Sequence, residues 1–401
     1  MATETFEVEG HIIDSLILAK VLDTILDAGA EYRIVDVEIG RASTDASRAR
    51  IEVEADDGVL TTLATELQLH GANRVEDADA SLAECDRDGV LPQGFYSTTN
   101  LRTQVRLGGH WADVASPEMD CAIVVHDSGA ATTPMHRVCV GDQVVVGLDG
   151  VRVQPLERPR GANPFEFMAS EVSSEKPKEL LVGEVADRIR AARSAGGKLL
   201  AVCGPAVIHT GAGPDLARLV RGGWVDVLFA GNGFATHDIE SNVLGTSLGV
   251  LLEQGLPIEH GHANHLRVIN EVRRRGSIAA AVADGYLTGG VMYECVQHEV
   301  PFVLGGSVRD DGPLPDVYTN VVEAADAMRA LVPGVAVALM LASTLHAIAT
   351  GNLLPAGVET FCVDINQAVV TKLADRGSHQ ALGIVTDAGL FLRLLAEHLC
   401  S

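Results

Sequence analysis

Lysine is scarce in this 401-residue chain, because only five of its 30 basic residues are lysine. Acidic residues number 54, which gives a formal net charge of −24, and no basic run interrupts the acidic background. A polyanion such as DNA or RNA would be repelled by this charge, so the composition argues against nucleic-acid binding. Long apolar runs are also absent: the longest, from Val335 to Leu345, is far shorter than the ~20 residues that span a bilayer.

The sequence also has no C-x-x-C cysteine pair and no recognisable signal-peptide pattern. The seven cysteines are scattered, their number is odd, and none forms a C-x-x-C pair. In a chain of this size that pattern is typical of reduced, mostly buried thiols. The segment from Met1 to Gly10 is acidic and lacks the positive-then-apolar order of a signal peptide. We therefore expect a cytoplasmic protein without a membrane span.

The sequence predicts three regions. Hydrophobic residues make up 47% and charged residues 21%, as in ordinary globular proteins. Residues 1–90 begin with a β-α-β-β-α pattern typical of a split-βαβ α+β module, and residues 91–160 carry short β-rich runs between glycine turns, which we interpret as a β-rich extension. A linker or crossover containing several prolines is expected near residues 155–178, before a third region at 179–401.

The third region predicts a doubly covered parallel sheet. Near-continuous apolar segments alternate with helical patterns there, which is typical of strands buried on both faces of a Rossmann-like domain. Each segment ends in small or polar residues, and ligands of open α/β sheets bind at these carboxyl ends. The expected strands are Lys198–Cys203, Val225–Ala230, Val300–Leu304, Val335–Leu341, Glu359–Val363 and Ala381–Val385.

Two of these strand ends are candidates for nucleotide binding. The glycine-rich loop from Gly204 to Pro214 would let the backbone approach a phosphate, but it is not a G-x-G-x-x-G motif, and a plain strand-to-helix turn explains it equally well. Asp364 follows the strand Glu359–Val363, where an acidic residue binds ribose hydroxyls and repels a 2′-phosphate, which favours NAD over NADP. The alternative is that Asp364 only caps the next helix.

Other strand ends carry ionisable residues. Three of the four residues from His237 to Glu240 are ionisable and follow Asn232-Gly233, so a base with an orienting partner or an ammonium site is expected, the alternative being a solvated first helical turn. The segment from His260 to His265 has no zinc-site spacing, and we expect it to face substrate or cap a helix. Arg309 can pair with a carboxylate, and Asp310 or Asp311 can bind an ammonium group or a ribose. The alternative is that Asp311-Gly-Pro is only a turn.

On these motifs the chain resembles the LOR/SDH conserved-region family, which includes archaeal-type ornithine cyclodeaminases and the C-terminal part of cyanobacterial arginine dihydrolase/ornithine cyclodeaminases. The resemblance runs nearly end to end. At Asn100-Leu-Arg-Thr103 the chain departs from the Asn-His-Pro-Thr expected in relatives. The other matching segments are Gly10–Ser15, Ile25–Gly29, Leu91–Asn100, Gly231–Glu240, Gly305–Pro315 and Val363–Asn366.

The resemblance implies a deoxyhypusine-synthase-like variant of the Rossmann fold that binds NAD. We also expect a homo-oligomer, and no metal site is expected on the histidine spacing. The resemblance further implies conversion of L-ornithine to L-proline and ammonia, in which NAD takes a hydride from substrate and returns it. An NAD-dependent amino-acid dehydrogenase of the saccharopine/lysine type and a catalytically silent amino-acid sensor remain alternatives.

With that reaction in view, we expect Asp238 with His237 to move protons. The residues expected to bind substrate are Glu240, His262, Asn264, His265 and Arg309. Those expected to contact NAD are Asn232, Gly233, Asp311, Ser343, Thr344, Leu345, His346, Asp364, Ile365, Thr386 and Asp387.

Overall fold

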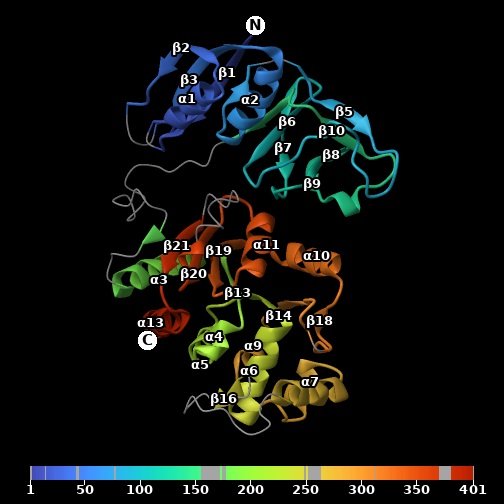
Figure 1. The fold of residues 1–401 in the computed structure, drawn as a ribbon, viewed down its shortest axis with the longest axis vertical. Helices are drawn as coiled ribbons and strands as arrows, with labels where there is room; N and C mark the ends of the chain where they lie inside the picture. The colour runs from blue at the N-terminus through green and yellow to red at the C-terminus, as the bar shows by residue number, and fades with distance from the viewer. Residues whose placement is uncertain are drawn as a thin grey trace. The chain divides into compact units, whose positions relative to one another are not determined.

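The chain forms two compact units in a computed structural model (Figure 1). One contains residues 1–167 with 354–357, and the other contains residues 168–353 with 358–401. The residues that the structure describes are 2–13, 15–41, 45–75, 78–154, 172–173, 178–247, 250–251, 263–310, 312–369 and 381–400.

The first unit begins with a four-stranded antiparallel sheet in the order β2-β3-β1-β4, covered on one face by two helices. Alternation in β1 and β3 directs Phe6, Val8 and Ile51 into the core, where they meet the apolar stripe of α1. The order β1-α1-β2-β3-α2 is the one that the residue pattern predicts. The elements are β1 (Ala2–Gly10), α1 (Ile17–Asp27), β2 (Glu31–Glu38), β3 (Ser47–Ala55), α2 (Asp57–Leu69) and β4 (Asn73–Arg74).

A seven-stranded sheet completes this unit, in the order β11-β6-β7-β9-β8-β10-β5. It packs beside α2 and β4: the Gln68 amide donates to the Val151 carbonyl at 3.0 Å, and the Asn73 amide donates to the Val153 carbonyl at 2.9 Å. The region that the sequence separates at residue 90 therefore shares one compact unit with its neighbour. The strands are β5 (Ser81–Glu84), β6 (Thr103–Leu107), β7 (His110–Ala115), β8 (Ala122–His126), β9 (Gly129–Thr133), β10 (Gln143–Val146) and β11 (Val151–Val153).

The second unit is built on an eight-stranded, entirely parallel sheet in the order β12-β21-β20-β19-β13-β14-β17-β18. Its central strands β13 and β19 are buried at all but one position each, as the apolar runs predict. The predicted Rossmann-like parallel sheet is confirmed. The strands are β12 (Val172–Ser173), β13 (Lys198–Cys203), β14 (Val227–Gly231), β17 (Phe302–Gly305), β18 (Val317–Tyr318), β19 (Val335–Leu341), β20 (Glu359–Asp364) and β21 (Ala381–Val385).

Helices cover both faces of this sheet (Figure 1). A short hairpin of β15 (Thr246–Ser247) and β16 (Val250–Leu251) follows α6. The helices are α3 (Lys178–Ser194), α4 (Ala206–His209), α5 (Gly213–Arg221), α6 (Asn232–Leu244), α7 (Asn264–Arg275), α8 (Ile278–Ala283), α9 (Val291–Gln297), α10 (Val321–Leu331), α11 (Leu345–Leu353) and α13 (Ala388–Leu399).

The strand order reverses at β13, which lies between β19 and β14. The chain runs from β13 outward to β18 and then returns to the other side of β13 as β19. Because parallel crossovers are right-handed, connections that run in opposite directions leave the sheet on opposite faces. Here α5 packs against α9 and α13, whereas α11 packs against β13, β14 and α10. The carboxyl ends of β13 and β19 therefore form a topological switch point, where α/β sheets bind ligands.

Two further expectations concern cysteines and membranes. All seven cysteines are free, and five of them are buried. None of the helices in the described ranges is both long and apolar enough to cross a membrane.

Candidate active site

Helix α6 starts directly at the carboxyl end of β14. Gly231 is its N-cap in an extended conformation, and Asn232 is the first helical residue. The Asn232 side-chain oxygen accepts hydrogen bonds from the Leu314 backbone N–H at 3.0 Å and from the Thr236 hydroxyl at 3.3 Å. Asn232 is buried, and its bond to Leu314 connects the start of α6 to the segment that follows β17. This contact fixes the position of the first turn of α6 relative to the sheet.

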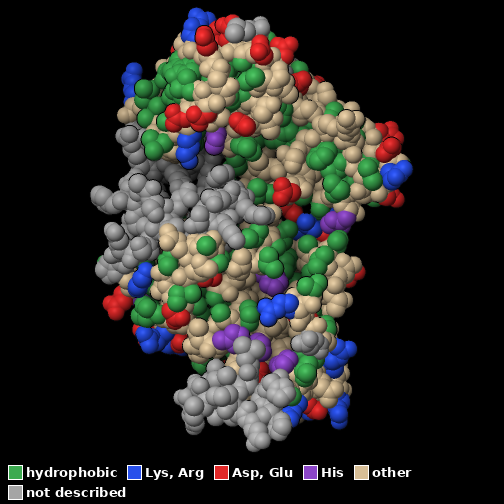
Figure 2. All heavy atoms as spheres, in the orientation of Figure 1, with side chains coloured by type: hydrophobic (Ala, Val, Ile, Leu, Met, Phe, Trp, Pro, Cys, Tyr) green, Lys and Arg blue, Asp and Glu red, His purple; other side chains and the backbone are tan. Residues whose placement is uncertain are grey.

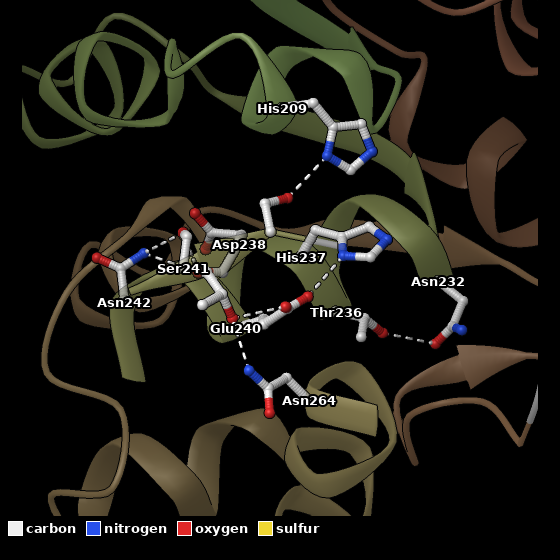
Figure 3. Close-up of polar contacts among 11 residues, drawn as sticks. His209, Asn232, Thr236, His237, Asp238, Glu240, Ser241, Asn242 and Asn264 are labelled. Atoms are coloured by element: carbon white, nitrogen blue, oxygen red, sulfur yellow. Dashed lines mark hydrogen bonds and ion pairs between the residues drawn. The ribbon is translucent and has the colours of Figure 1, made fainter. Parts of the chain in front are cut away.

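His237 and Glu240 form a buried pair on α6 (Figure 3). The Nδ1 atom of His237 lies 2.8 Å from Oε2 of Glu240, whose side chain is fully shielded from solvent. The Thr246 hydroxyl donates to the other carboxylate oxygen, Oε1, at 2.8 Å, and the Asn264 amide donates to the Thr246 oxygen at 3.0 Å. This chain of hydrogen bonds fixes the carboxylate and, through it, the orientation of the imidazole ring.

Two more histidines surround this pair. The ring centroid of His237 lies 4.7 Å from that of His209, at the end of α4, and 6.3 Å from that of His265 on α7. His209 Nδ1 lies 2.7 Å from the Ser247 hydroxyl oxygen. Burial and the neighbouring His237 lower the pKa of His209, although Glu240 opposes this shift, so its neutral form is favoured near neutral pH.

Asp238 faces a different part of the fold from His237. Its carboxylate is buried, and its two oxygens accept hydrogen bonds from the backbone N–H groups of Val291 at 2.9 Å and Met292 at 2.8 Å. These groups are the first turn of α9, whose N-cap is Gly290. Burial raises the pKa of Asp238 to about 6, although the two backbone donors oppose the shift. Asp238 thus ties α6 to α9, and its expected part in proton transfer stays a prediction.

The titration of Asp238 predicts a pH-dependent stability. Its pKa is about 6 in the folded protein and about 3.9 in an unfolded chain, so the native state holds this proton more tightly. The protonated carboxyl group of Asp238 therefore stabilises the folded protein fully below about pH 4. This contribution to the free energy of unfolding, about 3 kcal/mol, is lost as the pH rises through about 6. The stability advantage of the wild type over Asp238→Asn should fall accordingly when urea unfolding is measured from pH 4 to pH 7. If the free energy of unfolding of the two proteins changed equally with pH, the raised pKa of Asp238 would be contradicted.

The helix that follows β19 places a histidine ring against the ends of β14 and β17. The ring of His346, near the start of α11, lies so close to Gly231 and Gly305 that a Cβ at these glycines would be 2.8 Å from its Cε1 and 3.1 Å from its Nε2, respectively. Burial lowers the pKa of His346. Ser343 is buried, whereas Leu345 is exposed. The structure thus brings the predicted segment from Ser343 through Thr344 to His346 to the same edge as Asn232 and Gly233.

The acidic residues at the ends of β20 and β21 differ in what they hold. Asp364 Oδ1 accepts a hydrogen bond from the Asn366 backbone N–H at 2.8 Å and closes a local turn, whereas Asn366 itself caps the helix that begins at residue 367, because its Oδ1 accepts a hydrogen bond from the Ala368 backbone N–H at 3.0 Å. Asp387 is the N-cap of α13 and accepts a hydrogen bond from a backbone N–H of its first turn at 2.9 Å. Ile365 is exposed and Thr386 is buried. Their contacts with a cofactor stay predictions.

The loop containing Arg309 is a compact turn. The Ser307 backbone N–H donates to the Asp310 carboxylate at 2.7 Å, and the Arg309 backbone N–H donates to the Ser307 hydroxyl at 3.1 Å. These bonds fix the backbone of residues 307–310, and a role for Arg309 in binding substrate stays a prediction. Two expected site residues, His262 and Asp311, lie outside the described residues, as do most of the linker positions. Within the described ranges, no group of three or more His, Cys, Asp or Glu side chains is arranged to hold a metal ion.

The sequence did not single out three residues of this network. His209 lies inside the glycine-rich loop, where a single histidine among glycines does not indicate a partner. Thr246 and Ser247 had no signal, because hydroxyl residues near a glycine are common in any turn. Taken together, the parallel sheet, its switch point and the buried His237–Glu240 pair define an enzyme of the Rossmann-fold class.

Comparison with known proteins identifies the family. Residues 183–395 match the model described as arginine dihydrolase ArgZ-like, C-terminal, Rossmann fold, and residues 102–182 match the first region of the same C-terminal part. Residues 3–101 match the LOR/SDH bifunctional enzyme conserved region. The chain belongs to this LOR/SDH and ArgZ-like family, as the sequence motifs predict.

Individual relatives support the same assignment. The ornithine cyclodeaminase of Methanopyrus kandleri is 52% identical, over 99% of this chain and 97% of the relative. Crystalline apo ArgZ, an arginine dihydrolase from the ornithine-ammonia cycle in cyanobacteria, is 39% identical with a TM-score of 0.86, over 100% of this chain and 58% of ArgZ. The ternary complex of AgrE with ornithine and NAD+ is 41% identical with a TM-score of 0.55, over 100% of this chain and 57% of AgrE.

Proposed function

We propose that this protein is an ornithine cyclodeaminase, which converts L-ornithine into L-proline and ammonia without net oxidation. The Methanopyrus kandleri relative of that name matches almost the whole chain, and AgrE has been crystallised with both ornithine and NAD+. In this structure the proposal is carried by the buried hydrogen bond between His237 and Glu240, on the helix that follows β14 of a Rossmann-fold sheet and next to His209 on the helix that follows β13. A proton-transfer pair and a dinucleotide site are what this reaction needs in one place.

The carboxyl edge of the sheet fits a dinucleotide. Asp364 uses Oδ1 for its own turn, and its second oxygen can accept a hydrogen bond from a ribose hydroxyl. When bound, NAD supplies a hydride acceptor and afterwards a hydride donor. We assign its binding to the segments that follow the strands, namely Asn232, Gly233, Asp311, Ser343, Thr344, Leu345, His346, Asp364, Ile365, Thr386 and Asp387.

Proton transfer is assigned to His237. Because the Glu240 carboxylate accepts the hydrogen bond of Nδ1, the other ring nitrogen, Nε2, is the basic one and can take a proton from a substrate ammonium group. The negative charge of Glu240 then stabilises the imidazolium ion, and Thr246 keeps the carboxylate in place. Burial of the pair also limits water, which would hydrolyse an imine formed from the substrate.

The remaining polar residues are assigned to support and binding. Asp238 is a positioning residue, because both of its oxygens hold the start of α9. Asn264 supports Thr246 through a hydrogen bond, and His265 and His209 border the ring of His237. We assign substrate binding to these two histidines, together with His262 and Arg309.

A single preparation tests the proposal. Native mass spectrometry of the purified protein should find NAD in equimolar amount, and the protein should convert ornithine into proline and ammonia without added coenzyme. No net NADH absorbance should develop during the reaction. Accumulation of NADH in step with ornithine consumption would identify a dehydrogenase instead. Ornithine binding without formation of proline would identify an amino-acid sensor, and either result would overturn the proposal.

A further inference from the structure

Strand β2 leaves an unusually apolar edge uncovered. It is the outer strand of the four-stranded sheet, and each of its eight residues is exposed. Tyr32, Ile34, Val35 and Val37 have exposed fractions of 36–49%, and Ile39, just beyond the strand, reaches 65%. A long edge strand presents unpaired backbone N–H and C=O groups, and proteins normally protect it with charge, proline or a covering element. Half of the residues of β2 are charged, but its charges lie on one face of the strand and the other face is apolar and exposed, which leaves that face available to a partner.

The two faces of β2 differ in chemistry. Its register with β3 places Tyr32, Ile34 and Val37 opposite the buried residues Val53, Ile51 and Ala49, on the face that the helices cover. The charged residues Arg33, Asp36 and Glu38 lie opposite the other residues of β3, on the outer face. A bulge between residues 34 and 36 leaves Val35 without a partner in the register with β3.

The neighbouring helix extends the apolar surface. Helix α1 contacts β2, and its Leu26 has an exposed fraction of 56%. Figure 2 shows hydrophobic side chains gathered at the upper left of the molecule, over α1 and the edge of this sheet. Apolar area on the strand and on the adjacent helix together is what a protein partner would cover.

We propose that β2 pairs with β2 of a second copy of this chain, antiparallel and around a two-fold axis, to form a continuous eight-stranded sheet. In the register that places Arg33 opposite Glu38, Ile34 lies opposite Val37 and Tyr32 lies opposite Ile39. Each of these pairs joins residues of the same face, and the two-fold axis makes every pair occur twice. The strand is therefore complementary to itself in charge at Arg33–Glu38 and in apolar contact at Ile34–Val37 and Tyr32–Ile39, while Val35 and Asp36 lie opposite each other at the bulge, next to the two-fold axis.

The nearest alternative register is less favourable. Placing Arg33 opposite Asp36 also brings Glu31 opposite Glu38, and like charges directly across a sheet repel each other. The self-complementary register is the argument for a second copy over an unrelated partner. This interface is independent of the proposed catalytic activity, since none of its residues belongs to the candidate active site.

A charge swap tests the interface. Light scattering and native mass spectrometry should find the wild type at no less than twice the chain mass of 42.2 kDa. Arg33→Glu and Glu38→Arg should each raise the dissociation constant about tenfold, because each puts like charges opposite one another twice. The double variant Arg33→Glu/Glu38→Arg should restore association. Within one chain that double variant worsens the contacts with Glu52 and Arg48, so restoration must come from pairing between chains.

A control and an apolar variant complete the test. Ile34→Lys should also weaken association, whereas Val140→Lys, at a still more exposed apolar position away from β2, should leave it unchanged. Circular dichroism confirms that each variant is folded. A monomeric wild type, or single charge variants that associate like the wild type, would overturn the proposal. Failure of the double variant to recover would likewise refute the stated register.

Discussion

Replacing His237 with glutamine is expected to lower kcat for ornithine by about a hundredfold to ten-thousandfold, the usual contribution of a positioned acid–base group. Glutamine keeps the size and polarity of the side chain but cannot take up a proton. The buried Glu240 carboxylate would keep its hydrogen bond from Thr246, so the local fold should persist. Steady-state kinetics with ornithine, together with titration of NAD binding, separates a lost chemical step from a lost cofactor.

His298 provides the matched control for this variant. It lies at the end of α9 and also pairs with a glutamate, since its Nε2 atom is 3.2 Å from Oε2 of Glu294, but it is exposed to solvent. His298→Gln should therefore leave kcat unchanged. Glu240→Gln should impair turnover in the same direction as His237→Gln, because an amide cannot stabilise the imidazolium ion by its charge. Normal turnover in His237→Gln with NAD bound would refute the assignment of the proton to this ring.

The sequence predicted the sheet well because its signal is local. A strand buried on both faces must be apolar at every position, and Leu199 to Cys203 on β13 satisfy this without reference to any partner. The sequence pattern divides the first unit near residue 90, but it gives no information on how the two parts contact each other. Strand β5 pairs with β10, some sixty residues later in the chain, and no local pattern shows that pairing.

Within the site, helical geometry separates neighbours that the sequence groups together. His237 and Glu240 are three residues apart, so they share one face of α6, whereas Asp238 is turned about 100° away and faces α9. The spacing alone could have indicated this pairing. The contribution of His209 could not be inferred in the same way, because it comes from a separate helix and depends on how α4 packs against α6.

Capping residues show a second limit of sequence reasoning. An aspartate at the end of a parallel strand is suitable both for a ribose and for the first turn of the following helix. Asp387 caps α13 and Asp364 caps its own turn, yet a carboxylate has two oxygens and can serve both purposes. The two roles are therefore compatible at Asp364, and the sequence pattern is the same for either.

Replacing Gly204 with alanine should be the most damaging small substitution at the switch point. A Cβ on Gly204 would lie 1.8 Å from the backbone oxygen of Ala342 and 2.7 Å from its carbonyl carbon. Backbone atoms cannot rotate aside as a flexible side chain can, and Ala342 is held in the left-handed region (φ 46°) with its N–H bonded to the Val363 carbonyl at 2.9 Å. The ends of β13 and β19 would have to separate, at a cost of about 3 kcal/mol or more in the free energy of unfolding.

The same separation should weaken NAD binding, because the coenzyme is expected where the connections from β13 and β19 diverge. Urea unfolding of the apo protein and calorimetric titration with NAD measure the two effects independently. Gly58→Ala is the matched control: it introduces the same methyl group on α2, where no atom lies within 4 Å of the new Cβ. That variant should retain wild-type stability and affinity for NAD. If Gly204→Ala matched it in both respects, the close approach of the two backbones would have no part in shaping the coenzyme site.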